Sequence, residues 1–76
     1  MEVIHLQIEK KNRGGKTVTV LSGFTRDQSY LTQLASRLKQ SCGTGGTLKD
    51  RKIEMQGDCR SRVRELLLKE GFQVKG

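Results

Sequence analysis

The sequence has no proline, no tryptophan, two cysteines, two phenylalanines and one tyrosine. Two cysteines are too few for the disulfide framework of a small secreted protein. The absence of proline argues against a linker or a polyproline-type ligand. So few aromatic residues argue against RNA recognition by base stacking, as in RRM and OB domains. No run of about 18 apolar residues is present, which excludes a membrane-spanning helix from the predictions.

The chain is short and strongly basic. Its 76 residues suffice for one domain with one modest core, and we expect a single domain over residues 1–76. No signal peptide is visible at the start, so we expect a cytoplasmic protein with free thiols. Fifteen Lys and Arg residues against eight Asp and Glu give a net charge of +7. Such a surplus attracts polyanions, which are RNA, DNA or an anionic membrane surface.

Apolar residues alternate with polar ones over residues 3–9, and this period of two predicts a strand. Ile4, Leu6 and Ile8 are expected on its buried face. The following segment, residues 10–16, is basic and contains Asn and Gly-Gly, which suit a tight turn. The sequence therefore predicts a β-hairpin with a basic tip.

The second strand of this hairpin is predicted over residues 17–21, because β-branched residues favour strands. Its alternation places Val18 and Val20 toward the core, with Thr17 and Thr19 facing away.

Two helices are predicted from apolar stripes and end signals. The first follows Gly23, has Thr25 or Asp27 as its N-cap, and ends near Ser41–Cys42 before Gly43. Its stripe consists of Leu31, Leu34, Ala35 and Leu38.

The second helix is expected to begin with Asp58 as its N-cap and to end before Gly71. Its apolar stripe consists of Val63, Leu66, Leu67 and Leu68.

Three short strands complete the expected order, near residues 47–48, at 53–56 and at 72–74. The order β-β-α-β-β-α-β predicts an α+β fold, with two helices packed on one face of a mostly antiparallel sheet. The other face would be open to solvent or a partner. Its expected residues are His5, Gln7, Thr17, Thr19 and Glu54.

Catalytic and metal-binding patterns are weak. Gly15-Lys16-Thr17 resembles the end of a P-loop, but Lys10 occupies the place of the first glycine and a strand follows. His5, Cys42 and Cys59 provide at most three soft ligands, whereas a structural zinc site uses four. We therefore expect neither a metal nor a cofactor, and no enzymatic activity.

The basic residues are clustered along the chain. The hairpin segment carries four cations and no acid, and we predict that it contacts phosphates. These cations are Lys10, Lys11, Arg13 and Lys16. A second basic cluster consists of Lys49, Arg51 and Lys52, and the acidic Asp50 lies within it. For this cluster the sequence favours neither phosphate contact nor a solvated turn.

Residues 42–60 resemble the signature of the eukaryotic-type translation initiation factor one family, the SUI domain. The matching residues are Cys42-Gly43-Thr44-Gly45-Gly46-Thr47, Ile53-Glu54-Met55-Gln56-Gly57-Asp58 and Arg60. The likeness extends over residues 3–75, and the compact glycine-rich loop is similar to the prokaryotic branch, bacterial or archaeal.

This resemblance implies a factor that binds the small ribosomal subunit near the P site and modulates start-codon and initiator-tRNA selection. Ribosomal RNA is the implied partner, with initiator tRNA and mRNA as further candidates, and we expect a monomer that binds no membrane. The implied RNA-binding residues are Lys10, Lys11, Arg13, Gly14, Gly15, Lys16, Arg37 and Lys39. Gly57 and Asp58 correspond to the family's glycine-aspartate motif, for which we expect a structural role. The alternative is a non-catalytic protein-interaction module that uses the open sheet face.

Overall fold

The computed structural model describes residues 2–11 and 15–76. Its elements are β1 (Val3–Lys11), β2 (Lys16–Ser22), α1 (Gln28–Cys42), β3 (Gly46–Lys49), β4 (Lys52–Gln56), α2 (Arg60–Lys69) and β5 (Gln73–Lys75). This is the β-β-α-β-β-α-β order predicted from the sequence.

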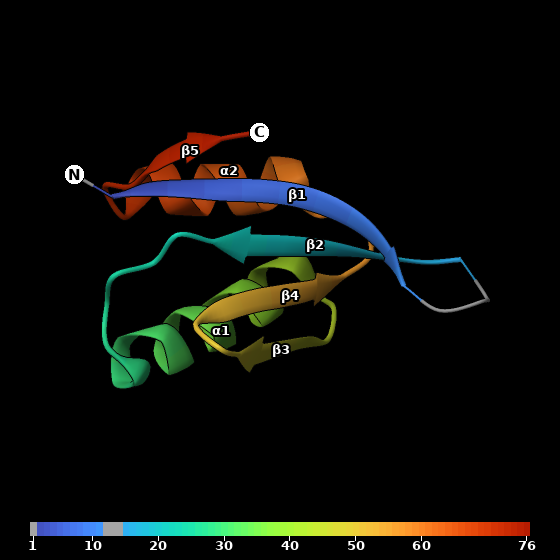
Figure 1. Ribbon diagram of the computed structural model, residues 1–76, viewed down its shortest axis with the longest axis horizontal. Helices are drawn as coiled ribbons and strands as arrows, with labels where there is room; N and C mark the ends of the chain where they lie inside the picture. Colours follow the sequence, from blue (N-terminus) through green and yellow to red (C-terminus); the bar gives the residue numbers. More distant parts are fainter. Residues whose placement is uncertain (1, 12–14) are drawn as a thin grey trace.

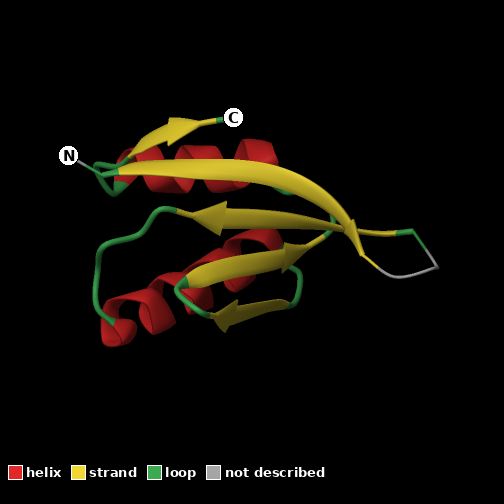
Figure 2. Ribbon diagram, in the orientation of Figure 1, coloured by secondary structure: helices red, strands yellow, loops and turns green. Residues whose placement is uncertain are grey.

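The five strands form one sheet in the order β3-β4-β2-β1-β5. Three neighbouring pairs are antiparallel, and β1 and β5 are parallel. Both helices lie behind the sheet in Figure 1, and Figure 2 shows the same two layers by type of structure. The predicted α+β class, with helices on one face of a mostly antiparallel sheet, is confirmed.

A single cluster of buried apolar side chains fills the space between the sheet and the helices. Its members are Ile4, Leu6, Leu21, Phe24, Leu31, Leu34, Ala35, Leu38, Ile53, Met55, Val63, Leu67 and Phe72. The predicted stripe of α1 is buried in full. In α2, Leu66 packs against the core from its edge, whereas Leu68 is 55% exposed. The helical period therefore predicts both stripes correctly except at Leu68, which faces solvent.

The orientation of β2 differs from the prediction. Leu21 pairs with Leu6 of β1 and with Ile53 of β4, and residues paired across strands share a face of the sheet. Because successive residues alternate, Thr19 also faces the helices and is fully buried. Val18 and Val20 lie on the other face. The prediction that the two valines face the core, with Thr17 and Thr19 facing away, is wrong.

The hydroxyl of Thr19 explains how a polar residue can occupy this buried position. It donates to the Gly57 carbonyl at 2.7 Å and accepts from the Cys59 backbone N–H at 2.9 Å. A buried hydroxyl that makes such bonds avoids the desolvation penalty of an unpaired one. The larger Leu21 is thereby free to fill the core.

The helix ends follow local rules at α1 and a long-range contact at α2. Asp27 caps α1, because its side chain accepts from the Tyr30 backbone N–H at 2.9 Å. Gly43 ends that helix with a left-handed φ of 66°. At α2 the N-cap position belongs to Cys59 and not to Asp58. The N-cap position therefore differs from the prediction by one residue, but the Asp58 side chain still accepts from the Arg60 backbone N–H at 3.3 Å. The Thr19 hydroxyl binds the Cys59 N–H.

Candidate nucleic-acid interface

One end of the molecule gathers several segments that the sequence singled out. The paired ends of β1 and β2 extend beyond the other strands, and the C-terminal end of α1 and the start of α2 lie toward the same side (Figure 1). Hydrogen bonds join these segments: Gln56 N–H donates to the Gly45 carbonyl at 3.0 Å, and Gly57 N–H donates to the Thr17 carbonyl at 2.7 Å. We call residues 9–11, 15–17, 39–46 and 56–62 the hairpin end.

The glycine-rich loop at this end is shaped by close packing. A Cβ atom on Gly46 would lie 2.9 Å from the Glu54 carbonyl oxygen and 2.9 Å from Met55 Sδ. Both neighbours belong to β4, the partner strand of β3. A side chain is therefore excluded at Gly46. At Gly45 the nearest atoms would be those of the flexible Gln56 side chain, at 3.4 Å.

The glycine-aspartate motif links β2 to α2. Gly57 has a φ of 83°, and its N–H and carbonyl both bond to β2, through Thr17 and Thr19. Both carboxylate oxygens of Asp58 accept from the Arg60 guanidinium, each at 3.0 Å. The side-chain hydrogen bond from Arg60 lowers the pKa of Asp58 and so favours its charged form. The motif thus fixes where α2 begins.

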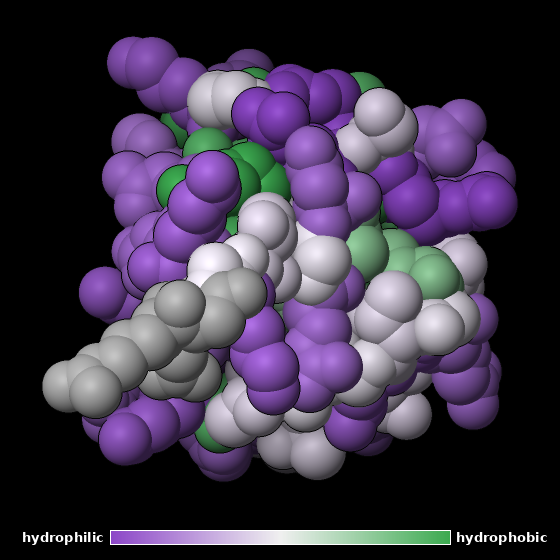
Figure 3. All heavy atoms as spheres, turned by 90° about the vertical axis from the view of Figure 1, so that its right-hand side faces the viewer, coloured by the Kyte–Doolittle hydropathy of each residue, from purple (hydrophilic) through white to green (hydrophobic). Residues whose placement is uncertain are grey.

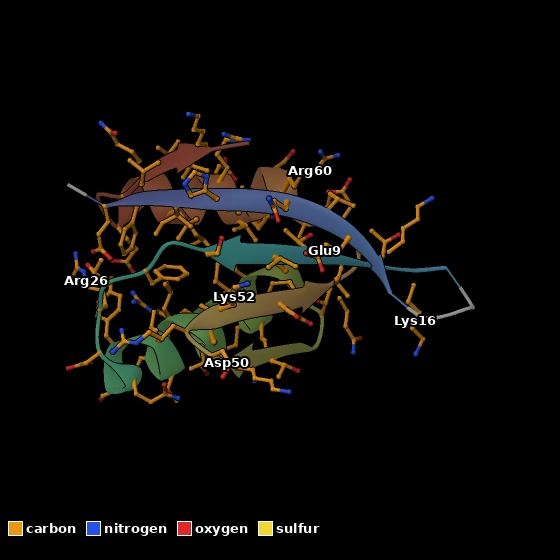
Figure 4. All side chains as sticks on the ribbon, viewed as in Figure 1. Glu9, Lys16, Arg26, Asp50, Lys52 and Arg60 are labelled. Atoms are coloured by element: carbon orange, nitrogen blue, oxygen red, sulfur yellow. The ribbon has the colours of Figure 1, made fainter. Side chains whose placement is uncertain are left out.

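Exposed cations stand on three elements of the hairpin end. Lys10 and Lys16 are exposed on the two strands of the hairpin, and Lys39 is exposed in the last turn of α1. Figure 4 shows Lys16 on the projecting arm, away from the body of the sheet. Figure 3 looks onto this end, where hydrophilic residues cover much of the surface.

Some of the predicted hairpin residues lie outside what the structure describes. Arg13 and Gly14 fall outside the described residues, and Lys11 is described only as the backbone end of β1. Gly15 is described: it is exposed and has a left-handed φ of 69°.

Arg37 and Lys39 occupy different surroundings although both belong to α1. Arg37 forms an ion pair with Glu70, which follows α2, and its side chain is 51% exposed. Lys39 packs its stem near Gly46, 3.3 Å from where a Cβ atom would lie, while the residue as a whole stays exposed. The structure therefore joins Lys39 to the hairpin end and uses Arg37 to tie the two helices together.

Arg60 and Arg62 add two cations that the sequence did not place at this site. Both are exposed in the first turn of α2. The sequence shows Arg60 as part of the family signature and Arg62 as a position of the predicted second helix. They lie beside the hairpin because β4 runs back to this end of the molecule before α2 begins. No local sequence pattern predicts that arrangement.

At the opposite end of the molecule, Arg26 contacts an acidic side chain and two aromatic rings. Its guanidinium pairs with Glu2 at 2.5 Å and lies 4.8 Å from the ring centroid of Tyr30 and 5.2 Å from that of Phe72. Burial raises the pKa of Glu2, but hydrogen bonds from Arg26 and Thr25 outweigh it and the net pKa is lowered. Glu2 thus stays charged, and the pair holds the start of β1 against the segment before α1.

The second basic cluster lies at this opposite end. Arg51 donates to the Arg26 carbonyl at 2.6 Å, while Lys49 and Lys52 are exposed. Asp50 and Arg51 have φ values of 52° and 63°, as in a two-residue hairpin turn. Arg51 thus supports the turn, and only the two lysines of this cluster stand free of the interactions described.

Over residues 2–11 and 15–76, no three His, Cys, Asp or Glu side chains come together in a group that could hold a metal ion. Within the same ranges, no helix has the length and apolar character needed to cross a membrane.

The fold and this site define a small basic α+β protein whose hairpin arm projects beside a glycine-aspartate turn. The family model of translation initiation factor SUI1 matches residues 1–73. A protein translation factor SUI1 homolog of Sulfolobus acidocaldarius is 48% identical over 71 residues, which are 93% of this chain and 71% of that protein. The uncharacterized protein YciH of Escherichia coli is 42% identical over 73 residues, 96% of this chain and 68% of that protein. The chain belongs to the SUI1 family, in its prokaryotic branch.

Proposed function

We propose that this chain is a non-enzymatic translation initiation factor that binds the small ribosomal subunit near the P site. There it modulates the selection of the start codon and the initiator tRNA. The observation that carries the proposal is the set of exposed cations on the hairpin end, above all Lys10 and Lys16 on the projecting arm. Membership of a family of translation initiation factors supports the same function.

The arrangement favours recognition of RNA through phosphates and shape. All three aromatic side chains pack together away from the arm: the Phe24 and Phe72 rings lie 5.7 Å apart, and those of Tyr30 and Phe72 6.3 Å apart. Their rings are therefore occupied and offer no platform for a base. Lysines on a narrow arm, with an exposed Gly15, suit close approach to a phosphate backbone.

We further propose that the chain is one SUI-like domain over residues 1–76, monomeric and cytoplasmic, whose RNA-binding arm is the hairpin loop at 10–16. The RNA-contacting residues would be Lys10, Lys11, Arg13, Gly14, Gly15, Lys16, Arg37 and Lys39. Among these, Lys39 is the stronger candidate on α1, because Arg37 would first have to release Glu70.

Co-sedimentation with purified small and large ribosomal subunits tests the proposal. We expect binding to the small subunit, and a sharp loss of it when Lys10, Lys11, Arg13 and Lys16 are all replaced by alanine. The matched control replaces four cations outside the hairpin end. These are Lys49, Lys52, Lys69 and Lys75, all of them exposed.

The control distinguishes a specific arm from diffuse attraction. Equal losses for the two fourfold variants would show that total charge drives binding and would contradict the assignment to the arm. No loss in either variant would contradict RNA binding and favour a protein-interaction module. The surface to test would then be the open sheet face, with His5, Gln7 and Glu54 but without Thr17 and Thr19.

A further inference from the structure

The only two cysteines of the sequence meet at the hairpin end, although 16 residues separate them in the chain. Cys42 is the last residue of α1, and Cys59 immediately precedes α2. Both are free thiols, and both are partly buried against the edge of the core. They line one open cavity of about 350 Å³ together with Ser41, Asp58, Ser61 and Arg62.

The two thiols line the same cavity, and Cys59 affects the pKa of Cys42. Burial raises the pKa of Cys42, and the neighbouring Cys59 raises it further through its charge and a side-chain hydrogen bond, against a smaller opposing effect of Arg62. The Cys59 thiol also lies 3.4 Å from the Gln56 carbonyl oxygen, to which it donates. Both cysteines line the same open cavity, which gives a small reagent access to them.

We propose that Cys42 and Cys59 form a reversible oxidation site, which a hydroperoxide converts into an intramolecular disulfide between the end of α1 and the start of α2. The proposal does not rest on the function proposed above. It needs only the two thiols, the cavity beside them and a peroxide as oxidant.

The reaction takes two steps, and its atoms balance for hydrogen peroxide. The Cys59 thiolate attacks one peroxide oxygen, the O–O bond breaks, and the products are a sulfenic acid on Cys59 and hydroxide, which takes up a proton to become water. The Cys42 sulfur then attacks the Cys59 sulfur, the S–S bond forms, and the S–O bond breaks with release of a second water. Two electrons pass from the two thiols to the peroxide, and a dithiol reductant reverses the change.

The order of the two cysteines follows from their surroundings. Because its pKa is raised, Cys42 holds its proton and is the poorer first nucleophile. Cys59 is the N-cap residue of α2 and lines the open cavity. We therefore assign Cys59 as the sulfur that is oxidised first and Cys42 as the resolving thiol.

The crosslink would close the loop of residues 42–59, which includes part of the hairpin end. Residues 42–59 include the glycine-rich loop, β3, β4 and Gly57. A disulfide restricts the unfolded chain more than the folded one, so the oxidised protein should unfold at a higher temperature than the reduced protein.

Peroxide treatment of the reduced chain, followed by intact mass and peptide mapping, tests the proposal. We expect a monomer that has lost two hydrogens, a peptide crosslinked through Cys42 and Cys59, and full recovery by a dithiol. The variant C42S should stop at a sulfenic acid on Cys59 that dimedone traps, whereas C59S should react more slowly. Disulfide-linked dimers, or a sulfinic acid on Cys59 without the crosslink, would overturn the proposal.

A second measurement tests the contact between the thiols without an oxidant and without a variant of altered folding. Phenylarsine oxide joins two adjacent thiols through one arsenic atom and releases water. The untreated chain should bind one equivalent and protect both cysteines from a maleimide, and a dithiol should reverse this. Labelling of both cysteines at full rate in the presence of the arsenical would show that the sulfurs do not meet and would overturn the assignment.

Discussion

Thr19 shows how one side chain can hold three parts of the fold together. It is the only polar residue that is buried among those the structure describes. Its hydroxyl donates to Gly57 and accepts from Cys59, so a residue of β2 fixes both the turn after β4 and the residue that precedes α2. If the hydroxyl were lost, these two partly buried hydrogen bonds would be lost with it, at about 0.5–1.5 kcal/mol each.

We therefore predict that T19V lowers the free energy of unfolding by about 1–3 kcal/mol, although valine has nearly the same shape as threonine. The matched control is T47V, at an exposed position of β3, which should change stability by less than about 0.5 kcal/mol. Urea unfolding of the three proteins measures the difference. If T19V and T47V unfold at the same urea concentration, the hydrogen bonds of the Thr19 hydroxyl do not contribute to the free energy of unfolding.

At the scale of the elements, local sequence patterns predict the helices and strands but not every orientation. The apolar stripe of α1 follows the helical period, and Asp27 and Gly43 mark the two ends of the helix. The local sequence therefore suffices to predict this helix. In β2 the run Val18-Thr19-Val20-Leu21 places apolar residues on both faces, and a period of two cannot decide between them. The deciding contacts of Thr19 are with residues 38 and 40 positions away.

The site shows the same limit. The basic hairpin and the glycine-rich loop could be predicted because each is a short continuous segment. The N-cap of α2, the position of Arg62 and the meeting of Cys42 with Cys59 could not, because each depends on how β4 returns to the hairpin end. The ion pair of Arg37 with Glu70 likewise joins segments far apart in the sequence, and no helical spacing indicates it.

The glycine-rich loop leads to a prediction about two neighbouring residues. G46A should destabilise the protein by about 1–3 kcal/mol, because a methyl group there would meet the β4 backbone and Met55 at 2.9 Å. G45A should be neutral or slightly stabilising, because its nearest contacts are ordinary ones with a flexible Gln56 side chain and alanine restricts the unfolded chain. Thermal unfolding of both variants measures this, and equal midpoints would contradict the proposed packing role of Gly46.

At the scale of the whole molecule, the two ends differ in what they do with their charges. The end opposite the arm uses Arg26 and Arg51 in contacts within the protein, with Glu2, with two aromatic rings and with a backbone carbonyl. The hairpin end leaves Lys10, Lys16 and Lys39 exposed. A net charge of +7 is thus distributed so that the projecting arm presents cations that no described contact engages.

This distribution predicts how binding to the small subunit depends on salt. Phosphate contacts release counterions, so the logarithm of the binding constant should fall linearly with the logarithm of the salt concentration. In the fourfold alanine variant of Lys10, Lys11, Arg13 and Lys16, the slope should shrink by about one unit for each phosphate contact removed. The control at Lys49, Lys52, Lys69 and Lys75 removes the same charge and should keep nearly the full slope.

Titrations of the three proteins at several salt concentrations measure these slopes. A binding constant that does not change with salt would contradict phosphate recognition, and equal slopes for the two variants would show that the contacts are not concentrated on the arm.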